Sequence, residues 1–442
     1  MSDDWLWMSA ADLGRGIGAG RIDPVALAEA HLDAAEAHPD GTRIYARLTR
    51  ERALAEAGAA AARARAGQRL GPLDGVPVSW KDLFDTAGVA TEAGSALLRD
   101  RVPERDAEVL ATATLGGLVC LGKTHMSEFA FSGLGLNPIT ATPPNIHDPQ
   151  AAPGGSSSGA AASVAHGLAP AGIGSDTGGS VRVPSAWNDL VGLKTTHGRL
   201  SLRGVVPLAA RFDTVGPLCR TVEDAGLLLA ALEGGRPADL TGATLSNARL
   251  LVLENGLADC RDAPAAAFET AVSRLSKAGA QIDRAHIPEL DSAQSMSGVL
   301  YTTEAWGTWG DRISADPDAM FARIRERFEA GGKVSGADYV AAWRRLDAIR
   351  ETVRARAAGY DALILPTTPN MPPNARRLLD EDDYYVTENL MTLRNTRFGN
   401  LLEGASLTLP TDTPGAGLMF LGKPMGEERL LRLGAAAEAA LA

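Results

Sequence analysis

The chain has 442 residues, of which 45% are hydrophobic, and a formal net charge of −11. This acidic balance excludes the basic faces that bind nucleic acid or an anionic membrane surface, and no apolar run approaches the roughly 20 residues that span a bilayer. The acidic start MSDDWLWMSAADL does not resemble a secretory signal, the three cysteines form no CxxC pair, and the seven histidines show no HExxH spacing. We therefore expect a cytoplasmic protein without a disulfide framework or a metal site.

The first seventy residues are predicted to be helical. Asp23 and Pro24 form a helix start, and the alanine- and arginine-rich segment LTRERALAEAGAAAARARAG is predicted to be a solvated helix that ends at Gly67. The pattern then changes, because LDGVPVSWKDLF is strand-like up to Lys81. The next segment, DAEVLATATLGGLVCLGK, predicts a helix and a short strand over Leu118–Leu121. Such helix–strand units are typical of an α/β fold.

Further along, NARLLVLEN, APAAAFETAVSRLSKAG and AQIDRAHI form a strand–helix–strand pattern. Residues 293–358 are predicted to be a helical, lid-like excursion. Strands then follow in YDALILPTTP, GASLTLPT and AGLMFLG, before a final helix in EERLLRLGAAAEAAL. Because we find no internal repeat and no clear linker, we predict one domain over residues 1–442. Its parts are N-terminal helices (1–70), the core (71–292), the excursion (293–358) and the C-terminal part of the core (359–442).

Two glycine–serine clusters stand out between residues 153 and 186. This region shows little periodicity apart from a short helix at Ala160–Ala165, and a loop region this long in a compact domain is either functional or disordered. A flexible linker would be embedded in polar sequence. Here GGSSSG opens into the apolar AAASVAHG, and DTGGS continues into the alternating pair Val181 and Val183. We therefore interpret both clusters as functional.

The second cluster has the composition of an anion-binding turn. The chain has no GxxxxGK[ST] and no intact GxGxxG, so a nucleotide loop is disfavoured. Consecutive backbone amides can instead stabilise an oxyanion, and a serine beside them is a candidate nucleophile. The predicted donors are the amides of Thr177, Gly178, Gly179 and Ser180.

A serine hydrolase of the α/β-hydrolase type is a weaker alternative. A nominal GxSxG elbow is centred on Ser157, but no strand precedes it as that motif requires. Asp283 and His286 lie downstream, only three residues apart, and do not strengthen this interpretation.

Six separate blocks that together cover nearly the whole chain resemble the amidase signature family. They are PVSWKDLFDTAG, LGKTHMSEFAFSGLGLNP, the long block from PGGSSSG to LRGVVPL, DTVGPLCRTVEDAGLLL, YDALILPTTP and the C-terminal GASLTLP to ERLLRL. The resemblance implies an α/β fold with a central mixed β-sheet covered by helices on both faces. It also implies hydrolysis of linear amides through an acyl-enzyme, without a cofactor.

The resemblance assigns the catalytic set residue by residue. Lys81 in SWKD is the base, Ser156 is the serine after a cis peptide bond, and Ser180 in DTGGSVR is the nucleophile. A lysine acts as a base only when it is neutral, so burial must lower its pKa from about 10.4. The resemblance gives Asp176 and Arg182 a supporting role through hydrogen bonds, and Ser157 becomes a supporting hydroxyl.

The substrate is predicted less sharply. In the family the loop 130–135 reaches the substrate, so the expected pocket residues are Ala130, Phe131 and Gly133. The helical excursion brings further apolar side chains, and we expect a small-molecule aryl amide, ester or carbamate (urethane) in an apolar tunnel. The residues expected to form this tunnel are Met296, Met320 and Trp306.

Two other functions stay open. The family also contains the glutamine-hydrolysing component of a tRNA-dependent amidotransferase, and a catalytically silent scaffold protein is an alternative of another class. His125 stands where the family more often has asparagine, as a packed side chain or a second base. We expect a monomer or a homodimer with no nucleic-acid or membrane partner.

Overall fold

A single mixed β-sheet runs through the chain. The computed structural model describes residues 2–442, and within them eleven strands form one sheet in the order β1-β3-β2-β4-β6-β5-β10-β11-β9-β7-β8. The strands are β1 (Tyr45–Leu48), β2 (Pro77–Lys81), β3 (Val119–Thr124), β4 (Ala171–Asp176), β5 (Val191–Lys194), β6 (Thr214–Cys219), β7 (Arg249–Leu253), β8 (Gln281–Ala285), β9 (Ala362–Pro366), β10 (Ser406–Pro410) and β11 (Gly417–Leu421).

Two parallel groups of strands flank an antiparallel centre. Strand β2 lies between β3 and β4 and is parallel to both, whereas the pairs from β4 through β6, β5, β10 and β11 to β9 are antiparallel. Strand β7 is parallel to β9 and to β8. All five residues of β2 are buried, as expected for a parallel strand covered on both faces.

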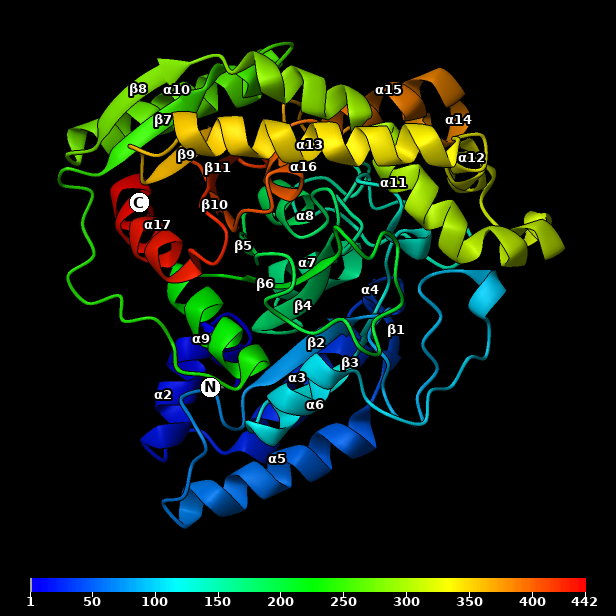
Figure 1. Ribbon diagram of the computed structural model, residues 1–442. Helices are drawn as coiled ribbons and strands as arrows, with labels where there is room; N and C mark the ends of the chain where they lie inside the picture. Colours follow the sequence, from blue (N-terminus) through cyan, green and yellow to red (C-terminus); the bar gives the residue numbers. More distant parts are fainter. Residues whose placement is uncertain (1) are drawn as a thin grey trace.

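Helices cover both faces of the sheet, as predicted (Figure 1). Helix α7 packs on β4, α9 on β6 and α17 on β10, while α11 packs on α12, α13 and α16. The helices are α1 (Ser2–Trp5), α2 (Ala10–Gly18), α3 (Pro24–Ala37), α4 (Gly41–Ile44), α5 (Arg50–Arg65), α6 (Glu108–Leu115), α7 (Ser158–Ala165), α8 (Arg182–Trp187), α9 (Val222–Glu233), α10 (Asp262–Lys277), α11 (Pro288–Ala315), α12 (Ala322–Gly331), α13 (Gly336–Arg356), α14 (Ala375–Asp380), α15 (Asp382–Thr392), α16 (Thr396–Leu401) and α17 (Glu427–Leu441).

Most predicted elements are present. Asp23 caps α3 by accepting hydrogen bonds from the amides of Val25 and Ala26, and the strand predicted to reach Lys81 is β2. The helical excursion corresponds to α11, α12 and α13 (Figure 1). The boundaries at 70, 292 and 358 stay predictions. Among residues 2–442, no helix combines the length and the apolar character needed to cross a bilayer.

Strand β4 was not predicted, because its sequence AGIGSD resembles a loop. Its glycines are required by the close packing of α7. A Cβ at Gly172 would lie 2.8 Å from the Ala160 carbonyl oxygen, and one at Gly174 would lie 2.6 Å from Ser157 Oγ. Strand β1, within the region predicted to be entirely helical, was also missed. The glycines of β4 therefore let a helix approach the sheet closely where the candidate site lies.

Candidate active site

Strand β2 places Lys81 inside the molecule. Successive side chains of a strand point to opposite faces, so Lys81 shares a face with Ser79, whose Oγ lies 2.8 Å from Ser163 Oγ of α7. The Lys81 side chain is fully buried. Its Nζ donates to Ser156 Oγ at 2.6 Å and to Ser175 Oγ at 2.8 Å. The structure thus brings together two of the three residues assigned from the resemblance.

The buried position of Lys81 changes its proton affinity. Loss of hydration disfavours the charged amine and lowers the pKa of Lys81 to about 7, although the negative charges of Asp176 and Asp213 act in the opposite direction. A substantial fraction of the amine is therefore neutral near pH 7. This meets the requirement that sequence reasoning placed on the base.

A tight loop holds Ser156 against Lys81. The peptide bond between Gly155 and Ser156 is cis, and Gly154 has a φ of +80°. The Gly155 amide donates to the Gly133 carbonyl oxygen at 2.8 Å, and the Ser156 carbonyl oxygen accepts from the Ser127 amide at 3.1 Å. Ser156 is fully buried, so the loop presents its hydroxyl to the interior.

The turn after β4 holds Ser180 and lies beside this loop. The Ser157 amide donates to the Ser180 carbonyl oxygen at 3.2 Å, so the two glycine–serine clusters are adjacent in space. The Ser157 hydroxyl donates to the Ser175 carbonyl oxygen at 3.2 Å. Ser157 therefore ties the loop to β4 and does not contact Lys81.

Asp176 organises the turn around Ser180. Its carboxylate accepts from the amides of Gly179 at 2.8 Å and Val181 at 3.1 Å, and Arg182 binds both carboxylate oxygens at 3.0 and 2.8 Å. Burial raises the pKa of Asp176, but the adjacent Arg182 guanidinium outweighs this and holds the pKa below its ordinary value. Asp176 is therefore ionised and fixes the backbone.

This contact narrows the predicted set of oxyanion donors. The Gly179 amide is already bonded to Asp176 and cannot also point at a substrate oxygen. Among residues 2–442, the amides of Gly178 and Ser180 donate to no protein acceptor, and both residues line a cavity, as does Thr177. The available donors are thus fewer than the four expected.

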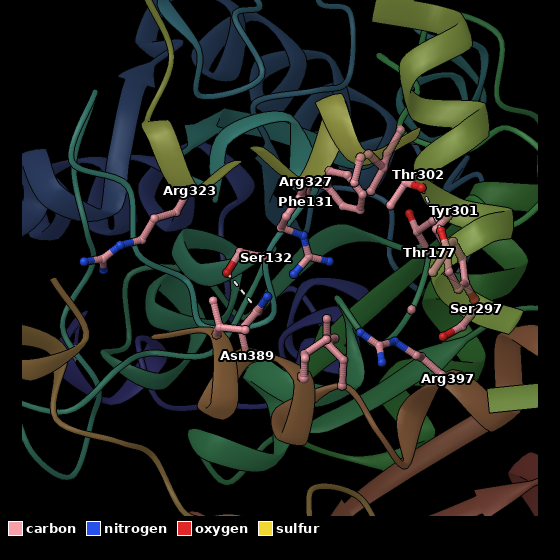
Figure 2. Close-up of a pocket in the computed structure, with 18 of the residues that line it drawn as sticks. Phe131, Ser132, Thr177, Ser297, Tyr301, Thr302, Arg323, Arg327, Asn389 and Arg397 are labelled. Atoms are coloured by element: carbon pink, nitrogen blue, oxygen red, sulfur yellow. Dashed lines mark hydrogen bonds between the residues drawn. The ribbon is translucent and has the colours of Figure 1, made fainter. Parts of the chain in front are cut away.

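The cavity next to Ser180 has a volume of about 340 Å³, in the range of small-molecule sites. Figure 2 shows that α11, α12, α15 and α16 contribute side chains to its wall. Its lining is Ala130, Phe131, Ser132, Thr177, Gly178, Ser180, Leu208, Ser297, Gly298, Tyr301, Thr302, Arg323, Glu326, Arg327, Ala330, Tyr385, Val386, Asn389, Leu390, Leu393 and Arg397. Within the described part of the chain, Lys81 and Ser156 lie behind this lining.

The predicted pocket residues are only partly in the wall. Ala130 and Phe131 line the cavity. Gly133 lies behind it, because its amide donates to Asn389 Oδ1 and a Cβ there would lie 2.7 Å from the Leu393 side chain. Trp306 packs against the Gly332 backbone, where a Cβ would lie 2.8 Å from its Nε1. The predicted apolar tunnel of Met296, Met320 and Trp306 is wrong, since none of them belongs to the described lining.

Sequence reasoning missed several polar residues of this site. Ser175, the second partner of Lys81, was hidden in the unrecognised strand β4. Arg327, Asn389 and Arg397 were missed because they lie in helices far along the chain from the signature blocks. Only tertiary packing brings them to the cavity. His125 lies outside the described lining, and burial lowers its pKa to about 4.

Comparison with known proteins agrees with this arrangement. The sequence profile of the amidase family matches residues 26–431. The chain is 36% identical to a 2-amino-5-chloromuconic acid deaminase of Comamonas testosteroni over 84% of this chain and 83% of the relative. It is 32% identical to the glutamyl-tRNA(Gln) amidotransferase component, of the type designated A, from Acidothermus cellulolyticus, over 99% of this chain and 95% of the relative.

A solved structure gives the same result. The peptide amidase of Stenotrophomonas maltophilia superimposes with a TM-score of 0.81 at 26% identity, covering 98% of this chain and 97% of that one. The chain therefore belongs to the amidase family, as the resemblance implied. It is an amidase-signature hydrolase of carbon–nitrogen bonds.

The ion pair of Asp176 and Arg182 is expected to be essential for stability. Removal of one partner leaves a buried charge uncompensated, so Arg182→Met should lower the free energy of unfolding by about 3–5 kcal/mol. Urea denaturation measures this change. As a control, Arg203→Met removes the exposed ion pair with Glu108 and should change stability little. Equal stability of the two variants would contradict the anchoring role of Arg182.

Proposed function

We propose that this amidase-family enzyme hydrolyses a small-molecule amide through an acyl-enzyme on Ser180, with Ser156 as proton relay and Lys81 as base. The observation that carries the proposal is the buried contact of 2.6 Å between Lys81 Nζ and Ser156 Oγ. It joins an amine that is partly neutral near pH 7 to a hydroxyl next to the turn that carries Ser180. A nucleophile, a base and an intermediary are the groups that covalent catalysis by serine requires.

The proposed reaction has two halves. Ser180 Oγ attacks the amide carbonyl while its proton passes to Ser156, whose own proton passes to Lys81. The developing oxyanion accepts hydrogen bonds from the amides of Gly178 and Ser180, each worth about 2.7–4 kcal/mol in related sites. Lys81 then returns a proton through Ser156 to the leaving amine. Water releases the acid from Ser180 by the same relay in reverse.

Aryl amides and carbamates are a finer proposal. A carbamate presents the same carbonyl to Ser180 and would release an amine, carbon dioxide and an alcohol. The apolar tunnel that favoured aryl groups is not part of the cavity, so this specificity now rests only on the family resemblance. Location in the cytoplasm, a monomer or homodimer, and the absence of a nucleic-acid partner also stay predictions.

A second candidate is the glutamine-hydrolysing component of a tRNA-dependent amidotransferase. It is favoured by the similarity to such a component over 99% of this chain. Hydrolysis of free glutamine in preference to other amides would support this candidate. A panel of glutamine, 4-nitroanilides, aryl carbamates and simple aliphatic amides therefore separates the two.

The role of Ser180 predicts a large kinetic effect. Ser180→Ala should lower kcat by several orders of magnitude on the best substrate of the panel, because no covalent intermediate can form. Ser158→Ala is the matched control. Ser158 is a buried serine of the same cluster whose Oγ has no hydrogen-bond partner among the described residues, and its replacement should leave kcat nearly unchanged. Near-wild-type turnover by Ser180→Ala would refute the assignment.

The lowered pKa of Lys81 predicts the pH profile. Protonation of Lys81 removes the base, so kcat/KM should fall about tenfold per pH unit below pH 7 and level off above about pH 8. Rates at pH 5–9 on a neutral amide measure this, with circular dichroism to confirm that the protein stays folded. The Ser158→Ala control should give the same curve. A rate that stays constant from pH 5 to pH 9 would argue against a lysine base.

A further inference from the structure

Two arginines in the cavity wall have no acidic partner. Arg327 on α12 and Arg397 on α16 both line the cavity, and neither forms an ion pair with any of residues 2–442. Arg327 Nε is buried without a hydrogen-bond partner in that part of the chain, and its guanidinium lies 4.4 Å from the centre of the Phe131 ring. A third arginine, Arg323, differs because it is paired with Asp382.

Such an arrangement is energetically unusual. Buried charges in proteins are paired, because removal of their hydration is costly. Burial together with the like charge of Arg327 lowers the pKa of Arg397 to about 10, and burial also lowers the pKa of Arg327. Two positive charges therefore face one space and raise each other's energy. An anionic group bound between them would relieve this repulsion.

A third hydrogen-bond donor faces the same space. Asn389 Oδ1 accepts from the Gly133 amide at 2.9 Å and from Ser132 Oγ at 3.2 Å. The oxygen is thus engaged with the wall, and the amide nitrogen of Asn389 is left for the cavity. Figure 2 shows the Arg327 and Arg397 side chains pointing into this space and Arg323 pointing away from it. The wall therefore offers donors where a carboxylate needs them.

This group of donors lies next to the candidate nucleophile. A Cβ at Gly178, in the turn that carries Ser180, would lie 3.7 Å from Arg397 Cγ. Gly178, Ser180, Arg327 and Arg397 all line one cavity. A short molecule can therefore have its carbonyl carbon at Ser180 and an acidic group at the arginines.

We propose that the substrate is an amide that also carries a free carboxylate, such as the monoamide of a short dicarboxylic acid. Arg327 and Arg397 bind the carboxylate, and Asn389 adds a hydrogen bond. A guanidinium binds a carboxylate through two parallel hydrogen bonds, which also orients the substrate. This inference rests on the proposed function, because it requires the amide to lie at Ser180.

Glutamine fits this cavity less well than a monoamide. Its ammonium group would need an acidic partner. Glu326 is the acidic residue of the described lining, and it is exposed. The inference therefore favours substrates whose net charge is negative.

The test compares glutaramate, the monoamide of glutaric acid, with glutaramide, which has the same size and no charge. The wild-type enzyme should have a kcat/KM about 10- to 100-fold higher on glutaramate, as expected for the loss of charged hydrogen bonds. Succinamate and adipamate should be included to cover shorter and longer chains. Arg327→Met and Arg397→Met should each remove most of this preference by raising KM for the monoamide, with little effect on glutaramide. Arg323→Met is the matched control and should keep the preference.

A binding measurement separates this inference from the proposed function. Calorimetry on Ser180→Ala should show glutarate binding at least about tenfold more tightly than glutaramide, and the Arg397→Met substitution should abolish the difference. Equal binding of the two, together with equal hydrolysis by the wild type, would overturn the carboxylate site while leaving Ser180 catalysis intact. A full rate in Ser180→Ala with selective glutarate binding would instead refute the proposed function alone.

Discussion

The amino group of Lys81 lies inside the sheet with the hydroxyls of Ser156 and Ser175 as acceptors. Hydroxyl partners satisfy its hydrogen bonds without the full charge that a carboxylate would supply, and this is why its pKa falls to about 7. The surrounding structure serves this one constraint. Strand β2 is covered on both faces, the glycines of β4 admit α7, and the loop at Gly155 brings the Ser156 hydroxyl to the amine.

The second organising contact links the catalytic turn to the cavity. Arg182 binds Asp176, which holds the amides of Gly179 and Val181, and it also donates to the Thr396 carbonyl oxygen at 2.6 Å. Thr396 is the first residue of α16, and the next residue is Arg397. One buried ion pair therefore positions both the turn that carries Ser180 and the helix that carries the proposed carboxylate-binding arginine. Chemistry and substrate selection share the same support.

The elements with strong local signals could be predicted from the sequence. The apolar residues before Lys81 indicated a strand, and Asp23 with Pro24 indicated a helix start. Strand β4 could not be found, because its glycines are explained only by the helix that packs on them. The arginines at 327 and 397 have the local pattern of ordinary helix-surface charges, and only the fold shows that they face a cavity. Gly133 was misplaced for the same reason, since its loop position does not reveal which side faces the substrate.

The central claim is that Ser180 is the nucleophile activated through Ser156 by Lys81. The most direct measurement is reaction with a fluorophosphonate, followed by mass spectrometry of the intact protein and of its peptides. The account predicts one adduct per chain, on Ser180, that forms much more slowly in a Lys81→Met variant. An adduct on another serine, or unchanged labelling without Lys81, would contradict it.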